Sequence, residues 1–284
     1  MAGFMSRKLI SVLLASTVAL SACGNSNSGG LFAPDPELEN FTARQIFERG
    51  EFEIENRKPD DAAFYFAEVE RLYPYSEYAK RALIMQAYSH HLDKDYENSR
   101  SAAQRYIDFF PTDDDAAYAQ YLLALSYYDQ IDEVGRGQGL TFQALQSLRA
   151  VIEKYPDSEY ARSSVLKFDL AFDHLAAKEM EVGRYYLKRD NFAAAANRFR
   201  VVVEDFETTT HTPEALHRLV ESYLSLGLTD EAQTAGAILG HNFRSTEWYE
   251  DSYRLLTGQG LEPRARGNGW LAGIYRQTVK GKWL

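Results

Sequence analysis

The sequence predicts an all-α protein in which about five helix pairs stack in chain order as an α-solenoid. Glycine and proline are sparse between residues 41 and 257, and alanine, leucine, glutamate, arginine and tyrosine fill that stretch. Few Val/Ile/Thr alternations appear there, so the composition favours helix over strand. Two recurring patterns divide the stretch into pairs: a junction of an aromatic residue with proline, and small residues at a fixed spacing.

The junctions mark where one pair ends and the next begins. Proline cannot continue a helix, and the aromatic residue before it can pack on the preceding turn. The pattern occurs three times, as Tyr73-Pro74, Phe110-Pro111 and Tyr155-Pro156. A polar helix start follows each one, at Ser76, at Thr112 with Asp113, and at Ser158.

Small residues recur 12 positions apart, in the pairs Gly50 and Ala62, Ala87 and Ser99, Gly183 and Ala195, and Val220 and Ala232. Four positions after the second member come Phe66, Ala103, Phe199 and Gly236. This resembles the tetratricopeptide pattern, in which small residues lie where two antiparallel helices touch. Val220, Ser99 and Gly236 depart from its consensus. Ala124 and Ala144 continue the pattern with eight extra residues around 132–139.

The predicted helix pairs span residues 43–74, 77–111, 115–156, 176–207 and 213–242, with a further helix near 246–257. No turn signal interrupts the sequence from Ser158 to Arg189. We therefore expect one helix of about 30 residues, about 45 Å long, joining N-terminal repeats to C-terminal repeats. The glycine-rich loop at 132–139 lacks the Gly-Lys-Ser/Thr ending of a phosphate-binding loop and is expected to be an interaction loop.

The N-terminus predicts export and lipidation. Arg7 and Lys8 precede a short apolar run, which ends in Leu20-Ser21-Ala22-Cys23. This order is typical of a secretory signal peptide, and the run is too short to span a bilayer. Leu-Ser-Ala-Cys resembles the bacterial lipobox, which implies cleavage before Cys23 with diacylglycerol on its sulfur and an acyl chain, such as palmitate, on its amino group. The alternative is a soluble exported protein with a cysteine near its cleavage site.

The predicted domains are a signal peptide at 1–22, a lipid anchor and flexible linker at 23–40, a solenoid at 41–257 and a tail at 258–284. The solenoid divides into N-terminal repeats at 41–156 and C-terminal repeats at 157–257. The tail carries five basic residues against Glu262, interleaved with aromatic residues. It could dock on an acidic partner or a membrane surface, or be disordered.

Charge and composition exclude several function classes. The formal net charge of −10 argues against binding nucleic acid. The single cysteine allows no intramolecular disulfide. No catalytic or metal motif appears, so we expect no enzyme, no metal and no cofactor beyond the lipid on Cys23. Of the adjacent residues His90 and His91, one is expected at a repeat interface and the other in water, and the run Asp113–Asp115 is expected to complement a helix dipole.

Together, the lipobox, the degenerate repeats and the long fourth-repeat helix resemble the BamD family of lipoproteins, also called ComL. The sharpest stretches are 71–76, 155–161 and 182–189 running into Asn197-Arg198. The resemblance implies a scaffold of the β-barrel assembly machinery, which binds the barrel subunit BamA, other Bam lipoproteins and unfolded outer-membrane proteins. It also implies lipid anchoring at the periplasmic face of the outer membrane, and Gly24 in place of an aspartate agrees with that address.

The resemblance also implies roles for individual residues. Arg198, Arg189 and Tyr185 fall where the family contacts its barrel subunit, and Tyr73 and Ser76 fall where it receives substrate. The alternative for Arg198 is a solvated charge opposite Phe199, and for Tyr73 a purely structural repeat ending. Two rival functions stay open: a periplasmic repeat lipoprotein of cell-wall or secretion complexes, and a lipid-anchored hydrolase.

Overall fold

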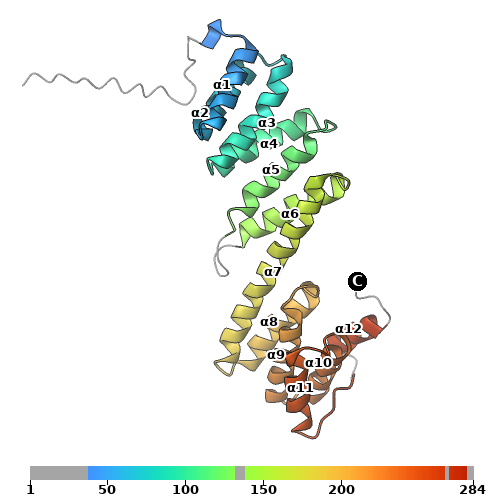
Figure 1. Ribbon diagram of the computed structural model, residues 1–284. Coiled ribbons are helices and arrows are strands. Elements are labelled where there is room, and N and C mark those ends of the chain that lie inside the picture. The colour runs from blue at the N-terminus through green and yellow to red at the C-terminus, as the bar shows by residue number, and fades with distance from the viewer. Residues whose placement is uncertain (1–37, 132–137, 266–268, 280–284) are drawn as a thin grey trace, which may run out of the picture. The chain divides into compact units, whose positions relative to one another are not determined.

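The computed structural model describes residues 38–131, 138–265 and 269–279, and over these residues the chain is helical without strands. The chain divides between Asn40 and Phe41, and all the described α-helices lie after this division. Before it lies a short 3-10 helix, Leu38–Asn40. The helices, labelled in Figure 1, are α1 (Ala43–Glu55), α2 (Pro59–Leu72), α3 (Glu77–Leu92), α4 (Tyr96–Phe109), α5 (Ala116–Tyr128), α6 (Gly139–Lys154), α7 (Glu159–Leu187), α8 (Phe192–Asp205), α9 (Thr212–Ser225), α10 (Thr229–Asn242), α11 (Glu247–Thr257) and α12 (Trp270–Val279).

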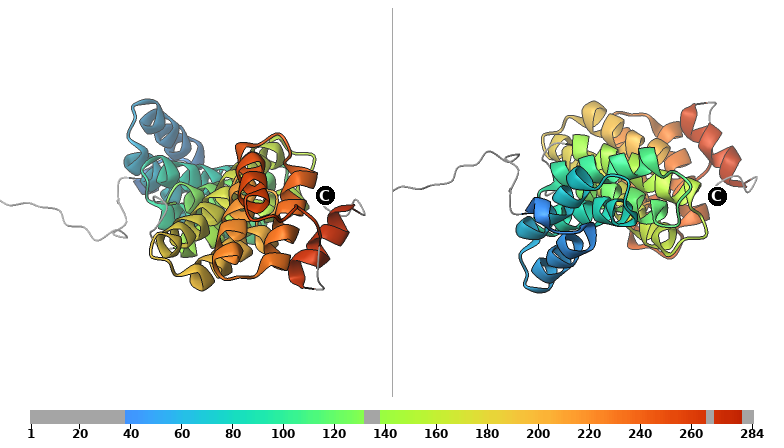
Figure 2. Two further views of the ribbon diagram at one scale, coloured as in Figure 1. Left: turned by 90° about the horizontal axis from the view of Figure 1, so that it is seen from below. Right: turned by 90° about the horizontal axis from the view of Figure 1, so that it is seen from above.

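Neighbouring helices pack against one another in chain order from α1 to α11, as Figures 1 and 2 show. First helices of successive pairs also touch, α1 on α3, α3 on α5 and α5 on α7. This is the packing of a tetratricopeptide-like α-solenoid, so the predicted fold class is confirmed. None of the described helices combines the length and apolar character that crossing a membrane requires.

Five junctions between pairs share one backbone geometry. The residue after α2, α4, α6, α8 and α10 is aromatic, and its N–H donates to the carbonyl four positions back. The residue three positions further on returns a hydrogen bond to the aromatic residue's carbonyl, at 3.0–3.2 Å. The five aromatic residues are Tyr73, Phe110, Tyr155, Phe206 and Phe243. The sequence pattern found three of them, because Phe206 and Phe243 lack the proline.

The small residues at the 12-residue spacing lie at helix contacts, as the pattern predicted. All eight members are buried. A Cβ on Gly50 would lie 2.7 Å from Cε1 of Phe66, closer than two carbon atoms can approach without displacement. At the Ala87–Ser99 contact, Ser99 departs from the consensus and bonds the two helices together. Its hydroxyl donates to the Ala87 carbonyl at 2.9 Å.

Asp113 joins two repeats, and its carboxylate also accepts from the Asp115 N–H at the start of α5, at 3.2 Å. Its carboxylate accepts hydrogen bonds from Lys80 at 2.5 Å and from the Tyr106 hydroxyl at 2.6 Å. These bonds lower the pKa of the Asp113 carboxyl to about 2. The expectation that one of the two adjacent histidines lies in water is wrong. Both His90 and His91 are largely buried, with side chains 16% and 15% exposed, and each faces an aspartate.

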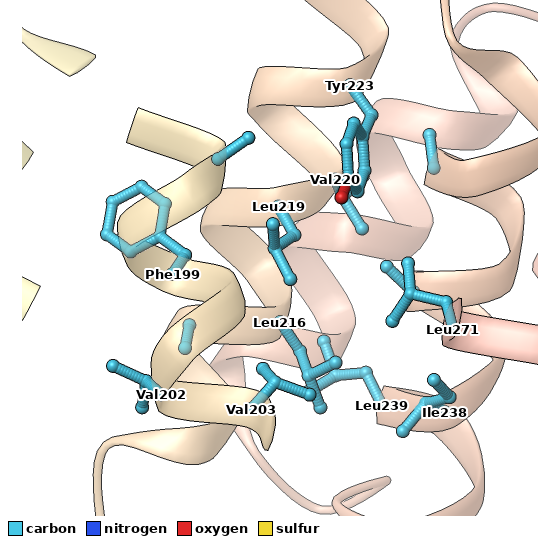
Figure 3. Close-up of a cluster of buried hydrophobic side chains, with 14 of the residues drawn as sticks. Phe199, Val202, Val203, Leu216, Leu219, Val220, Tyr223, Ile238, Leu239 and Leu271 are labelled. Carbon is cyan, nitrogen blue, oxygen red and sulfur yellow. The ribbon is translucent and has the colours of Figure 1, made fainter. Parts of the chain in front are cut away.

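The tail contributes a helix to the C-terminal core. In α12, Leu271 is 2% exposed and, as Figure 3 shows, it approaches Ile238 of α10 among side chains from α8 and α9. Trp270 lies under the Arg200 guanidinium of α8, 4.7 Å from ring centroid to Cζ. Within the described residues, this part of the tail is therefore a helix packed on α10 (Figure 2).

Candidate functional site

The C-terminal end of α7 presents an aromatic residue paired with a cation. Tyr185 is 52% exposed, and the Arg189 guanidinium lies 3.7 Å from the centroid of its ring. Tyr186, next along the helix, packs edge-on against Tyr185 and against the core. The α7 helix ends one turn before Asp190, which has a positive φ of 57°. This stacking holds two exposed side chains in a fixed arrangement at the helix end.

Arg198 lies on α8, and its Nη1 donates to Glu179 of α7 at 3.0 Å. Its side chain is 45% exposed while that of Glu179 is 16% exposed. Glu179 precedes Tyr185 by six residues, about 9 Å along the helix. The predicted contact residues Arg198, Arg189 and Tyr185 therefore share one helix pair. Arg198 is neither buried nor simply solvated, since Glu179 holds its Nη1 while 45% of the side chain stays exposed.

An ion cluster around the buried Glu214 joins this helix pair to the next helix. Glu214 of α9 is 9% exposed and accepts two bonds from Arg184 of α7, one of them at 2.8 Å from Nε. Arg218 approaches the same carboxylate at 3.4 Å. Burial raises the pKa of the Glu214 carboxyl. The two arginines together lower that pKa by more than burial raises it, so it lies below its ordinary value. The cluster links the end of α7 to α9.

Tyr73 and Ser76, the predicted substrate residues, are both engaged within the fold. The Tyr73 hydroxyl donates to the Phe41 carbonyl at 2.5 Å. Ser76 caps α3: its hydroxyl accepts from the Ala79 N–H at 3.2 Å and donates to the Tyr73 carbonyl. Ser158 makes the same pair of bonds at the start of α7. The geometry thus gives Tyr73 and Ser76 a structural role, and contact with a substrate stays a prediction.

Two exposed aromatic residues beside these junctions were not singled out from the sequence. Tyr75 is fully exposed between α2 and α3, and Phe109 is 65% exposed at the end of α4. Phe109 packs edge-on against Phe110, the junction residue. Each lies within two positions of a junction aromatic residue in the sequence. That proximity is the one feature of the sequence that could have pointed to them. Cys23 and residues 132–137 of the predicted interaction loop lie outside the described residues.

Across residues 38–131, 138–265 and 269–279, no group of three or more His, Cys, Asp or Glu side chains is arranged to hold a metal ion.

The stacked helix pairs define the class of this chain: it is a tetratricopeptide-like repeat protein. Its residues 39–238 match the model of the family described as YfiO, outer membrane lipoprotein, so the chain belongs to that family.

Two curated relatives are each named outer membrane protein assembly factor BamD. The relative from Caulobacter vibrioides is 42% identical over 255 residues, which cover 90% of this chain and 82% of the relative. The one from Rickettsia prowazekii is 41% identical over 250 residues, covering 88% and 96%. A solved structure, the tetratricopeptide domain of P58(IPK), aligns with 76% of this chain and 56% of its own at 17% identity and a TM-score of 0.28, too low to support an argument.

Proposed function

We propose that this chain is a non-catalytic scaffold for the assembly of outer-membrane proteins, anchored by lipid on Cys23 at the periplasmic face of the outer membrane. Membership of an outer-membrane lipoprotein family supports the location. The names of the two relatives, both assembly factors, support the role. The repeats behind the anchor offer binding surface, and tethering raises the effective concentration of that surface next to membrane-embedded partners.

In this proposal the C-terminal repeats hold a BamA-like barrel subunit. The observation that carries it is the exposed stack of Arg189 on Tyr185 at the end of α7. A pre-ordered aromatic residue beside an arginine loses little conformational entropy on binding, and both residue types dominate protein interfaces. Arg198, on the neighbouring helix, can pair with a partner carboxylate through the nitrogens that Glu179 leaves unused.

The N-terminal repeats receive unfolded substrate in the same proposal. Tyr75 and Phe109 expose aromatic surface at successive junctions, with Tyr73 and Ser76 fixing the first junction from within. Aromatic side chains of an extended peptide would gain from stacking on such rings.

Affinity purification of the lipidated chain from solubilised membranes tests the proposal. We expect a BamA-like barrel protein to co-purify, and Arg198→Glu to lower its yield, because the substitution places a carboxylate against Glu179 and against an acidic partner. Arg44→Glu is the matched control, since Arg44 is also an exposed arginine paired on its own repeat, with Glu48 at 2.7 Å. Recovery of cell-wall or secretion proteins without a barrel protein would reject the proposal.

A further inference from the structure

The long helix α7 packs on different helices along its two halves. It contacts α5 and α6 along its first half and α8 along its second. The buried residues of the first half are Ala161, Ser164 and Ala171, whereas those of the second half include Met180 and Gly183. At 100° per residue these two sets lie on different faces of the helix. The face covered by α8 in the second half therefore has no described helix over it in the first.

The end of α8 can be located on α7. Phe206, the first residue after α8, has its ring centroid 4.9 Å from that of Phe172. About three turns of α7 precede Phe172. Val165, three and seven positions before Phe168 and Phe172, shares their face of the helix and is 42% exposed. A helix that continued the layer of α8 would pack on these residues.

A groove of about 630 Å³ lies at this place. Its walls come from α6, α7 and α8, and its apolar lining includes Phe142, Leu145, Phe168, Phe172, Val201 and Phe206. Phe142, at the α6 rim, is 56% exposed. A volume of this size accommodates several side chains of a docked segment.

Charge at the groove indicates what kind of segment fits. Arg149, on the α6 wall, stacks over Phe168 at 5.4 Å, and no carboxylate of the described residues forms an ion pair with it. Of the two acidic residues in the lining, Glu179 is already held by Arg198, and the exposed Asp205 lies at the end of α8. Arg149 is thus an exposed cation at the edge of an apolar groove, where its planar fork can pair with a carboxylate of a docked segment.

We propose that this groove binds an amphipathic helix of a partner protein, which lays its apolar side chains against Phe142, Phe168 and Phe172 and pairs an acidic residue with Arg149. Such a helix would continue the α8 layer over the first half of α7 at the usual spacing of about 8–10 Å between axes. The groove excludes the junction edge proposed for substrate and the Tyr185–Arg189 stack, and it borders Arg198 through Glu179. Substitutions at Arg149 and at Arg189 test the inference and the proposed function separately.

The test places a photo-reactive benzoylphenylalanine at position 142 of the full-length, lipidated chain in its native membranes. We expect an adduct whose partner peptide, mapped by mass spectrometry, has apolar residues at helical spacing and an acidic residue among them. Arg149→Glu should lower the adduct yield by about tenfold or more, because like charges across an interface repel, and Arg149→Lys should keep most of it. Circular dichroism confirms that each variant keeps its helix content.

Leu170→Glu is the matched control, because Leu170 is a 63% exposed apolar residue of α7 whose position places it on the opposite face from Phe168 and Phe172. It should leave the adduct unchanged, and so should Arg189→Glu, which tests the proposed function separately. The inference is overturned by an adduct with a second copy of this chain or with its own residues 280–284. A partner peptide without helical apolar spacing, an unchanged yield in Arg149→Glu, or no adduct overturns it too.

Discussion

Gly50 and Gly183 mark two places where a phenylalanine ring lies directly against a helix backbone. The rings belong to Phe66 and Phe199, both fully buried on the partner helix of the same pair. A side chain at either glycine would occupy the volume of the ring, so close approach, not backbone freedom, requires glycine there. The 12-residue spacing in the sequence arises because the two helices of a pair meet at this contact.

Replacing Gly50 by alanine should therefore destabilise the first helix pair. The added Cβ would lie 2.7 Å from the Phe66 ring, and overpacking of this kind costs about 1–3 kcal/mol, more than the gain in helix propensity of about 1 kcal/mol. Urea unfolding followed by circular dichroism measures the difference. Gly139→Ala is the control, since nothing lies within 4 Å of its Cβ position, and it should be neutral or stabilising. An equal effect of both substitutions would contradict the contact.

His217 should make the stability depend on pH. It is 4% exposed, and burial lowers its pKa, with Arg218 adding to the effect and Glu221, Asp251 and Glu214 opposing it. Its Nδ1 lies 2.8 Å from the Ser252 hydroxyl. The unfolded state, with a histidine pKa of about 6.5, then binds protons that the folded state does not. The contribution is present above that pH and is lost as the pH falls below it. Burial also lowers the pKa of His90 and His91, which add with the same sign.

We expect the urea midpoint of the unsubstituted chain to fall between pH 7 and pH 5, and His217→Gln to flatten that dependence. Glutamine retains a hydrogen-bonding group for Ser252 but takes up no proton. A midpoint that depends on pH as steeply in His217→Gln as in the original chain would show that another group is responsible.

The burial of Gly50, Ala62 and Phe66 could be predicted from the sequence, because spacing alone specifies which residues meet between antiparallel helices. The partners of Asp113 and the burial of both His90 and His91 could not. Those depend on which side chain the next repeat brings within reach, and the helical period of one element contains no such information. The same limit left Tyr75 and Phe109 unnoticed, since exposure depends on the neighbouring repeats.

At the scale of elements, α7 could be predicted from the sequence and α12 could not. The length of α7 follows from the absence of any turn signal between Ser158 and Arg189, and the observed 29-residue helix, Glu159–Leu187, matches it. The helix α12 is short, 10 residues, and lies in a glycine-rich, basic stretch. Its stability comes from packing on α10, which no local pattern reports.

Truncating the buried side chain of α12 should weaken the C-terminal repeats. Leu271→Ala removes a leucine that is 2% exposed, and such changes cost about 2–5 kcal/mol. Arg276→Ala, on the exposed side of the same helix, should change the stability by less than about 0.5 kcal/mol. Thermal unfolding of the two variants compares them. Equal melting temperatures for the two would show that α12 is not part of the core.

For the whole molecule, the anchor and the repeats have separate roles in our proposal. Lipid on Cys23 holds the chain at the outer membrane, and α1–α12 supply the binding surfaces. Cys23→Ser should leave the helix content and melting temperature unchanged, because the single cysteine forms no disulfide within the chain. The substituted chain should move from the membrane fraction to the soluble periplasmic fraction. Loss of the fold, or unchanged membrane association, would refute this role for Cys23.

The central claim is that the end of α7 holds a BamA-like barrel subunit, and a photo-reactive benzoylphenylalanine at position 185 tests it most directly. The replacement keeps an aromatic ring for Arg189 to stack on, and Tyr185 is 52% exposed. On illumination of intact membranes, the account predicts a single major adduct with an outer-membrane barrel protein. An adduct only with cell-wall or secretion components, or no adduct in a chain that is folded and membrane-bound, would contradict it.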